Sequence, residues 1–279
     1  SVDSAPPSAP RYDPVAHERY VDRLIAVFSA AAGRGAGDVV PPTIFICGMF
    51  RSGSTLLEQA LAGHPRVTAG GEIPALPAMA QQLSPFPEAV ETLAPERLKA
   101  IADVYRLSVA RLHPETDLLT DKRPDNFLLL GLAKLIFPAA KIIHTVRDPV
   151  DTCLSTFFLH LDHGMAYAKN LDHIAHYYQQ YRRLMSHWKA LYPHDIFDFD
   201  YDKFVRTPRE TLEPALRFCG LDWDERCLAF HERASLVRTA SVWQVREPLY
   251  QRSSGRSRAY EKHIAPLRAA LSAFYPPAS

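Results

Sequence analysis

The stretch of residues 43–72 constrains the fold of this 279-residue chain more than any other part of the sequence. It begins with the apolar run of residues 44–47 (IFIC), which is typical of a buried strand. A glycine-flanked turn over residues 48–55 (GMFRSGST) then leads into a helical pattern that ends near Pro65. A strand, a turn of this kind and a helix start aim backbone N–H groups at an anion. The sequence therefore predicts an anion-binding turn between a strand and a helix.

The turn has the spacing of a phosphate-binding P-loop, GxxxxG followed by two further residues, with one substitution. A nucleoside triphosphatase has Lys and then Ser or Thr at that point, whereas this chain has Ser54 and Thr55. Because the P-loop lysine neutralises the β- and γ-phosphates, its absence disfavours ATP hydrolysis. The turn instead carries Arg51, whose planar guanidinium can hold a phosphoryl or sulfuryl oxygen with two hydrogen bonds. We therefore favour a different phosphorylated anion, with a ligand-free strand–helix turn as the alternative.

The alternation of strand, turn and helix occurs twice more. Residues 118–120 are a predicted strand that leads through the turn of residues 121–126 into an apolar helix over residues 127–137. Residues 141–146 are another predicted strand, and Pro149 then begins a helix. This alternation is typical of a parallel sheet with right-handed crossovers. We predict a three-layer α/β/α domain with a central, mostly parallel sheet.

The remaining segments complete this domain. The spacing of apolar residues predicts three helices, a long helix and a short strand, over residues 15–32, 98–112, 208–218, 171–192 and 196–199. A Pro-broken segment follows Glu72, and periodicity fails over residues 237–260, which is typical of a functional or disordered loop. We expect residues 1–13 to be disordered, residues 14–42 to form an N-terminal helix and linker, and residues 43–275 to form the main domain.

The composition excludes several classes of protein. A formal net charge of +1 argues against a nucleic-acid coat or a polyanion binder. We find neither an apolar run long enough to span a membrane nor a secretory signal. The four cysteines lack CxxC spacing, which predicts buried thiols in a reducing, cytoplasmic compartment and no metal site. The excess of arginine over lysine, together with many alanines, favours a GC-rich bacterial source.

Three cationic residues follow the three predicted strands. These residues are Arg51, Lys122 and Arg147. Because ligands of open α/β sheets bind at the carboxyl ends of the strands, the three cations predict a polyanionic ligand. Ser155 lies about two helical turns beyond Arg147, so both side chains can face the same edge. The alternatives are a capping turn with a local ion pair at Arg147 and a solvated lysine at residue 122.

At this point the sequence resembles a known family. Residues 48–65 (GMFRSGSTLLEQALAGHP) are similar to the phosphosulfate-binding loop of sulfotransferases that use 3′-phosphoadenosine 5′-phosphosulfate (PAPS). The resemblance is strongest to protein-tyrosine sulfotransferases and their bacterial relatives, some of which carry tetratricopeptide repeats upstream. Phe50 and Ser54 replace the usual Pro and first Thr. The resemblance runs from about residue 40 to 270 and implies a nucleotide-covering loop over residues 239–260.

The resemblance also implies roles for individual residues. Lys122 and the turn would meet the phosphosulfate, Arg147 and Ser155 would hold the 3′-phosphate, and the late loop would complete the nucleotide site. Tyr201 falls where related enzymes place an aromatic ring by the adenine. The full implied cofactor set is Arg51, Ser52, Gly53, Ser54, Thr55, Arg147, Ser155, Tyr201, Ser241, Gln244 and Arg256. No metal is implied.

Sulfuryl transfer to a hydroxyl needs a base for the acceptor's proton and positive charge near the leaving oxygen. The resemblance implies that Glu72, which follows the Gly70-Gly71 turn, is this base and that Lys122 and Arg51 assist it. An exposed loop carboxylate is the alternative reading of Glu72. His64 and His144 are alternative bases, although His64 lies in a helix-ending turn and His144 within a strand.

The acceptor is not defined by the sequence. Protein-tyrosine sulfotransferases have arginines just after the catalytic glutamate, and this chain has Pro74 and Ala78 there. An acidic tyrosine peptide is therefore disfavoured, and the hydroxyl can belong to another protein, a glycan or a small molecule. We leave a homodimer open and expect no nucleic-acid partner. A P-loop-like kinase and a non-catalytic nucleotide-binding module are the two alternative functions.

Overall fold

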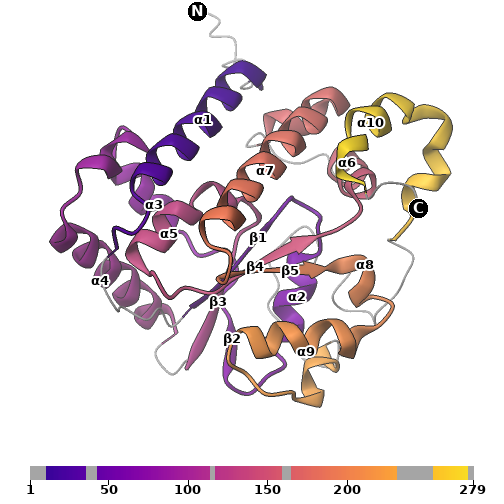
Figure 1. Cartoon of the computed structure of the whole chain (residues 1–279). Helices are drawn as coiled ribbons and strands as arrows, with labels where there is room; N and C mark the ends of the chain where they lie inside the picture. Colours follow the sequence, from indigo (N-terminus) through magenta and orange to yellow (C-terminus); the bar gives the residue numbers. More distant parts are fainter. Residues whose placement is uncertain (1–10, 36–42, 114–116, 159–164, 231–253, 276–279) are drawn as a thin grey trace, which may run out of the picture.

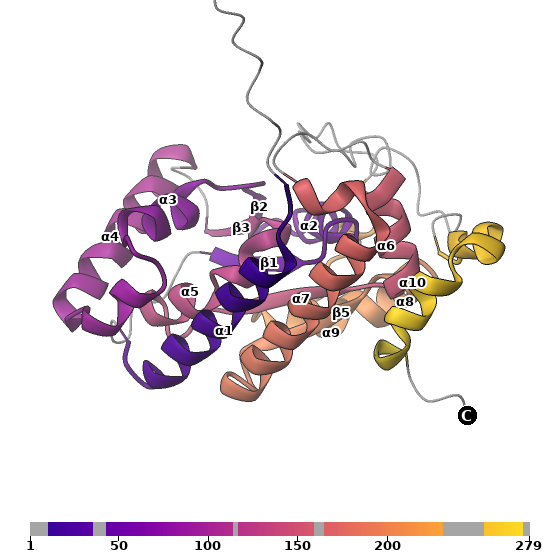
Figure 2. The same ribbon diagram turned by 90° about the horizontal axis from the view of Figure 1, so that it is seen from above.

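A central five-stranded sheet organises the computed structural model, which describes residues 11–35, 43–113, 117–158, 165–230 and 254–275. The strands lie in the order β2-β3-β1-β4-β5, and all the recorded pairings are parallel. Their bounds are β1 Thr43–Gly48, β2 Val67–Ala69, β3 Leu118–Lys122, β4 Ile142–Val146 and β5 Ile196–Asp200. Helices cover both faces of this sheet (Figures 1 and 2). The predicted three-layer α/β/α class is confirmed.

Successive side chains of β1 point to opposite faces of the sheet and enter two separate cores. Phe45 and Cys47 pack with the larger layer of helices, and Ile44 and Ile46 pack with the smaller one. The larger layer holds α1 (Pro14–Ala30), α3 (Ala75–Gln82), α4 (Pro95–Leu112), α5 (Leu130–Ile136), α6 (Pro149–Phe158), α7 (Leu171–Leu191) and α10 (Ala265–Ala270). The smaller layer holds α2 (Ser54–Leu61), α8 (Tyr201–Phe204) and α9 (Pro208–Phe218).

Short 3₁₀ helices complete the described chain. They are η1 (Glu88–Thr92), η2 (Pro124–Leu128), η3 (Ala166–Lys169), η4 (Glu225–Cys227), η7 (Arg256–His263) and η8 (Ser272–Phe274). Among the described helices, none has both the length and the apolar character of a membrane span. All four cysteines are free thiols, and three are buried whereas Cys219 is half-buried.

The strand order creates a switch point beside β1. The chain passes from β1 to β2 and β3 on one side of it, and then to β4 and β5 on the other. Ile46 is in register with Lys122 of β3, and Gly48 is in register with Thr145 of β4. The carboxyl ends of β3, β1 and β4 are therefore neighbours, which is where open α/β sheets bind ligands. The prediction that Arg51, Lys122 and Arg147 approach one edge is confirmed.

Several predicted elements differ from the structure. The segment after Glu72 is helix α3, because Pro77 lies in its first turn, where a proline ring costs no hydrogen bond. The predicted helix of residues 127–137 is shorter in the structure, where α5 begins at Leu130, because Leu129 has φ −114° and separates it from η2. Strand β2 was not predicted. Tyr12 and Asp13, predicted to be disordered, are ordered, because Asp13 caps α1 and Tyr12 hydrogen-bonds His176.

Candidate active site

The turn between β1 and α2 is tightly held. A Cβ at Gly48 would lie 2.4 Å from Thr145 Oγ1, so the turn needs glycine there to approach β4. The hydroxyls of Ser52 and Thr145 lie 2.6 Å apart, and Thr145 Oγ1 donates to the Cys47 carbonyl at 3.1 Å. Arg51 has φ 70°, a left-handed conformation that is uncommon for a residue with a side chain. A strained arginine at a fixed turn is typical of a functional site.

The second glycine of the turn caps α2 and contacts a tyrosine ring. Gly53 has φ 97°, and a Cβ there would lie 2.3 Å from the Tyr201 ring. Ser54 and Thr55 follow in the first turn of α2 and are buried. Since the first amides of a helix have no intrahelical acceptor, this end of α2 suits an anion. The hydroxyl of Ser52 pairs with Thr145 of β4, and its amide donates to the Met49 carbonyl of the turn at 3.1 Å.

Two guanidinium groups meet at this turn. Arg51 Nε donates to Ser155 Oγ of α6 at 3.1 Å, and Arg147 Nη1 donates to the Arg51 carbonyl at 3.0 Å. The Arg147 guanidinium also lies over the Tyr201 ring, 5.0 Å from its centroid. The structure thus brings together four residues that the sequence placed in the cofactor site. Ser155 contacts Arg51, whereas the sequence paired it with Arg147.

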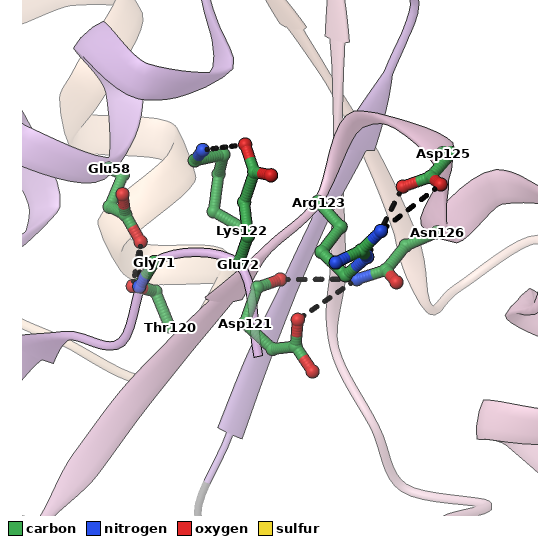
Figure 3. A network of polar contacts seen from close by, with 9 residues as sticks. All are labelled: Glu58, Gly71, Glu72, Thr120, Asp121, Lys122, Arg123, Asp125 and Asn126. Atoms are coloured by element: carbon green, nitrogen blue, oxygen red, sulfur yellow. Dashed lines mark hydrogen bonds and ion pairs between the residues drawn. The ribbon is translucent and has the colours of Figure 1, made fainter. Parts of the chain in front are cut away.

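The end of β3 carries an ion pair (Figure 3). Lys122 Nζ donates to Glu72 Oε1 at 2.9 Å; the lysine side chain is 1% exposed and the glutamate side chain 40%. The carboxylate therefore lies on the solvent side of the ammonium. An ammonium has three donors, and among the described residues Glu72 is the hydrogen-bond partner of Lys122 Nζ. The remaining donor capacity suits a second anion.

A second carboxylate, Glu58 of α2, lies beneath this pair and was not recognised in the sequence. Its Oε1 accepts from the Gly71 amide at 2.9 Å and from Thr120 Oγ1 at 2.7 Å. Burial raises the pKa of Glu58, while the charge of Lys122 and the two hydrogen bonds oppose that rise. The sequence feature that could have identified Glu58 is an acidic residue among the apolar residues of a predicted helix.

Asp121 points to the opposite face of β3 from Lys122. It accepts from Tyr105 Oη at 2.9 Å and from Asn126 Nδ2 at 3.2 Å. Burial raises the pKa of Asp121 to about 7, opposed by these hydrogen bonds. Asp121 therefore ties β3 to α4 and to the turn that follows, and its part is structural.

The two alternative bases point elsewhere. His144 is fully buried and is hydrogen-bonded to Asp198 Oδ1 at 2.7 Å and to the Tyr181 hydroxyl of α7. Burial lowers the pKa of His144, opposed by Asp198. His64 is buried too, and its Nδ1 accepts from the Arg66 amide at 3.2 Å. Neither imidazole is placed to reach an acceptor, whereas Glu72 is exposed at the strand ends.

The late segment is anchored to α6. Asp151 accepts from the amides of Gly255 and Ser257 at 2.5 and 2.7 Å. These contacts place Arg256 beside α6, with its guanidinium 5.8 Å from the centroid of Phe158. The two other predicted loop residues, Ser241 and Gln244, lie outside the described residues.

Comparison with known proteins decides the family. The sequence matches the family model described as Sulfotransferase family over residues 42–225. This chain belongs to the sulfotransferase family. The match covers β1 to β5 and every candidate site residue that precedes the late segment. The predicted family is thereby confirmed.

Relatives of this sulfotransferase-family chain are longer. It is 34% identical over 273 residues to an uncharacterized protein of Aquifex aeolicus, covering 92% of this chain and 36% of the relative. It is 27% identical over 210 residues to protein-tyrosine sulfotransferase 1 of Danio rerio, covering 68% of this chain and 56% of the relative. The chain thus spans about a third to a little over half of the curated relatives it matches.

Solved sulfotransferase domains share the fold. The sulfotransferase domain of the Synechococcus PCC 7002 olefin synthase is 25% identical with a TM-score of 0.62, over 88% of this chain and 99% of that one. The sulfotransferase domain of the curacin biosynthetic pathway is 20% identical with a TM-score of 0.57, over 85% and 98%. The second likeness concerns the fold alone.

Proposed function

We propose that this domain transfers the sulfuryl group of PAPS to a hydroxyl of an acceptor. The observation that carries the proposal is the buried Lys122, whose ammonium has the exposed Glu72 as its hydrogen-bond partner among the described residues, at the end of the sheet where Arg51 and Arg147 meet. The Lys122 ammonium and the guanidinium groups can bind an anionic donor. The Glu72 carboxylate can accept the proton of an acceptor hydroxyl. Family membership supports the same activity.

The residues at the turn fit the anionic groups of PAPS. Arg51 and Arg147 offer planar donors to phosphate or sulfate oxygens, and Ser155 adds a hydroxyl. The amides at the start of α2 suit the 5′-phosphate, and the Tyr201 ring beside Gly53 offers a stacking surface for the adenine. Arg256, anchored beside α6, is a further candidate for the 3′-phosphate. The 3′-phosphate is the group that distinguishes this cofactor from AMP and ATP.

The bound phosphosulfate supplies an activated sulfuryl group, so the protein has to orient the acceptor and manage charge and a proton. Glu72 takes the proton of the acceptor hydroxyl while the acceptor oxygen bonds to sulfur. The bond from sulfur to the bridging oxygen breaks, and 3′-phosphoadenosine 5′-phosphate (PAP) leaves. Lys122 and Arg51 stabilise the negative charge that grows on the bridging oxygen. Atoms and charge balance, because the proton ends on Glu72.

We propose that the acceptor is uncharged near its hydroxyl. The exposed residues that follow Glu72 at the start of α3 include Pro74 and Ala78, which carry no charge. An acidic tyrosine peptide finds no cation at these two positions. A small alcohol, a phenol, a glycan or a neutral protein segment fits them better. The free thiols further suit a reducing, cytoplasmic compartment.

The test is a transfer assay with PAPS labelled in its sulfuryl group, a panel of phenols and aliphatic alcohols, and excess EDTA. We expect labelled ester and PAP in equal amounts, without dependence on Mg²⁺, because Ser54 stands where a P-loop kinase has lysine. Adenosine 5′-phosphosulfate, which lacks the 3′-phosphate, is the matched control and should be a much poorer donor. Phosphate transfer from ATP that needs Mg²⁺, with none from PAPS, would establish the kinase alternative instead.

A further inference from the structure

The backbone just before Glu72 is held from two sides. The Gly71 amide donates to Glu58 Oε1 at 2.9 Å, and the Gly71 carbonyl accepts from the Lys122 amide at 2.8 Å. Glu72 is the next residue, and its carboxylate meets the ammonium of the same Lys122. Glu58, Gly71, Glu72 and Lys122 thus form one chain of contacts (Figure 3).

The Gly70-Gly71 turn has no side chains that could fix its conformation. A Cβ at Gly70 would lie 2.3 Å from the Thr120 carbonyl, and Gly71 has φ 65°. Both positions therefore favour glycine, and a glycine pair gains little order from its own torsion preferences. Hydrogen bonds supply the order instead. The Gly70 amide donates to the Thr120 carbonyl and hydroxyl, each at 3.2 Å, and that hydroxyl donates to Glu58 at 2.7 Å.

The burial of Glu58 needs a reason. Glu58 is 3% exposed and lies in α2, whose other buried residues include Leu57 and Leu61. An apolar residue there would avoid the cost of removing a carboxyl group from water. Glu58 repays part of that cost because its Oε1 satisfies two donors, the Gly71 amide and Thr120 hydroxyl, that would otherwise be unpaired.

We propose that Glu58 is a positioning residue for Glu72: its side-chain oxygen grips the Gly71 amide and so fixes the carboxylate of Glu72 over Lys122. This role rests on the proposed function, since it assigns Glu72 as the base. What matters is the reach of the Glu58 oxygen, not its charge. A loop that drifts by an ångström would place Glu72 poorly, and such misplacement can cost about 100-fold in rate.

Two conservative substitutions separate reach from charge. Glu58→Gln keeps an oxygen at the same distance, able to accept both hydrogen bonds, and removes the charge. Glu58→Asp keeps the charge and withdraws the oxygen by one methylene. We expect Glu58→Gln to form PAP from PAPS within about threefold of the wild-type rate, and Glu58→Asp to be slower by roughly 10- to 100-fold. Gln59→Asn is the matched control, because it shortens the neighbouring buried side chain of α2 and should leave the rate unchanged.

Two further readouts distinguish positioning from a general loss of structure. PAP affinity by calorimetry should stay within about threefold in Glu58→Asp, because the two residues that Glu58 hydrogen-bonds, Gly71 and Thr120, lie outside the turn that carries Arg51. Hydrogen–deuterium exchange of residues 68–74 should quicken in Glu58→Asp and not in Glu58→Gln or Gln59→Asn, while exchange of β5 should not change.

The opposite pattern, a fast Glu58→Asp and a slow Glu58→Gln, would overturn the proposal in favour of a charge effect. Unchanged exchange of residues 68–74 in Glu58→Asp would also overturn it. Because the exchange experiment needs no turnover, it remains decisive for the grip on Gly71 even if the wild-type protein fails to use PAPS. That last failure would instead remove the proposed function.

Discussion

Two lysines with almost fully buried side chains lie at opposite ends of the parallel strands, one at the amino ends and one at the carboxyl ends. Their ammonium groups have different numbers of hydrogen-bond partners. Lys134 of α5 lies at the amino edge, where its Nζ donates to Asp195 Oδ2 at 2.8 Å, to the Ala140 carbonyl at 3.3 Å and to the Pro138 carbonyl. Lys122 lies at the carboxyl edge, where among the described residues its Nζ hydrogen-bonds Glu72. Their side chains are 3% and 1% exposed.

We propose that Lys134 is a structural cation and that Lys122 is a functional one. Lys134 uses all three donors within the protein, so its ion pair stabilises the fold and has no capacity left for a ligand. Within the described part of the chain, Lys122 has one hydrogen-bond partner and lies at the end of the sheet where parallel strands bind ligands. Burial alone does not reveal this difference, because both lysines are equally hidden. The difference lies in the number of hydrogen-bond acceptors around each ammonium group.

The largest effect should come from the carboxylate over Lys122. Glu72→Gln keeps shape and hydrogen-bonding reach but cannot take a proton, so kcat should fall by roughly 10²–10⁴-fold. PAP affinity should hardly change, which calorimetry measures. Glu96→Gln, the same change at an exposed residue of α4, is the control. Wild-type turnover of a genuine acceptor by Glu72→Gln would show that another group is the base.

Removal of each lysine in turn tests the comparison directly. Lys122→Ala should lower turnover by about 100-fold and weaken PAP binding, because its cation meets the donor. Lys134→Ala should instead lower the free energy of unfolding by on the order of 2 kcal/mol, since it leaves Asp195 and two carbonyls with fewer partners. Urea unfolding and PAP titration of both variants measure these effects. A Lys134→Ala variant that folds but loses PAP affinity would break the comparison.

Asp121 offers a second comparison, with Lys122 itself. The two residues are neighbours in β3, but the side chain of Asp121 faces the structural core. Burial raises its pKa to about 7, so between about pH 4 and pH 7 the folded protein holds a proton that the unfolded chain releases. This contribution to stability is full below about pH 4 and is lost as the pH rises through 7, at up to about 1.4 kcal/mol per pH unit. Asp121→Asn should remove this slope, which urea unfolding at several pH values measures. An unchanged slope would contradict the buried, protonated carboxyl.

The smallest effect should come from the anchor of Arg51. Ser155→Ala removes the hydroxyl that accepts from Arg51 Nε, and loss of one such hydrogen bond should weaken PAP binding about fivefold. Ser272→Ala, the same change at an exposed residue of η8, is the control. Equal affinities of the Ser155→Ala variant and wild type would mean that the Ser155 hydroxyl does not support the anion site.

The parts of this site that local patterns encode could be predicted from the sequence. An apolar run followed by GMFRSGST defines β1, the turn and the start of α2, and the cations after three strands indicated the ligand edge. The role of Glu58 could not be predicted from its own neighbours in the sequence, because it depends on the turn after β2 bringing the Gly71 amide to α2. Strand β2 has only three residues, too few for a periodic signal.

Packing also decided details that propensity could not. Pro77 suggested a break, yet its place in the first turn of α3 makes it harmless. The sequence paired Ser155 with Arg147 because one follows a strand and the other lies two turns into the next helix, whereas the fold brings Arg51 between them. The difference between Lys122 and Lys134 likewise depends on the acceptors that distant segments deliver.

The most direct test of the central claim, a PAPS site at the carboxyl edge, is a calorimetric titration of the wild-type protein with PAP and with AMP in EDTA. Arg147 is buried and fixed to the turn by its bond to the Arg51 carbonyl. We propose that it gives the 3′-phosphate a charge-assisted contact that AMP lacks. A contact worth about 2 kcal/mol predicts PAP binding some thirtyfold tighter than AMP, and Arg147→Ala should erase that preference. Equal affinity of the wild-type protein for PAP and AMP would contradict the account.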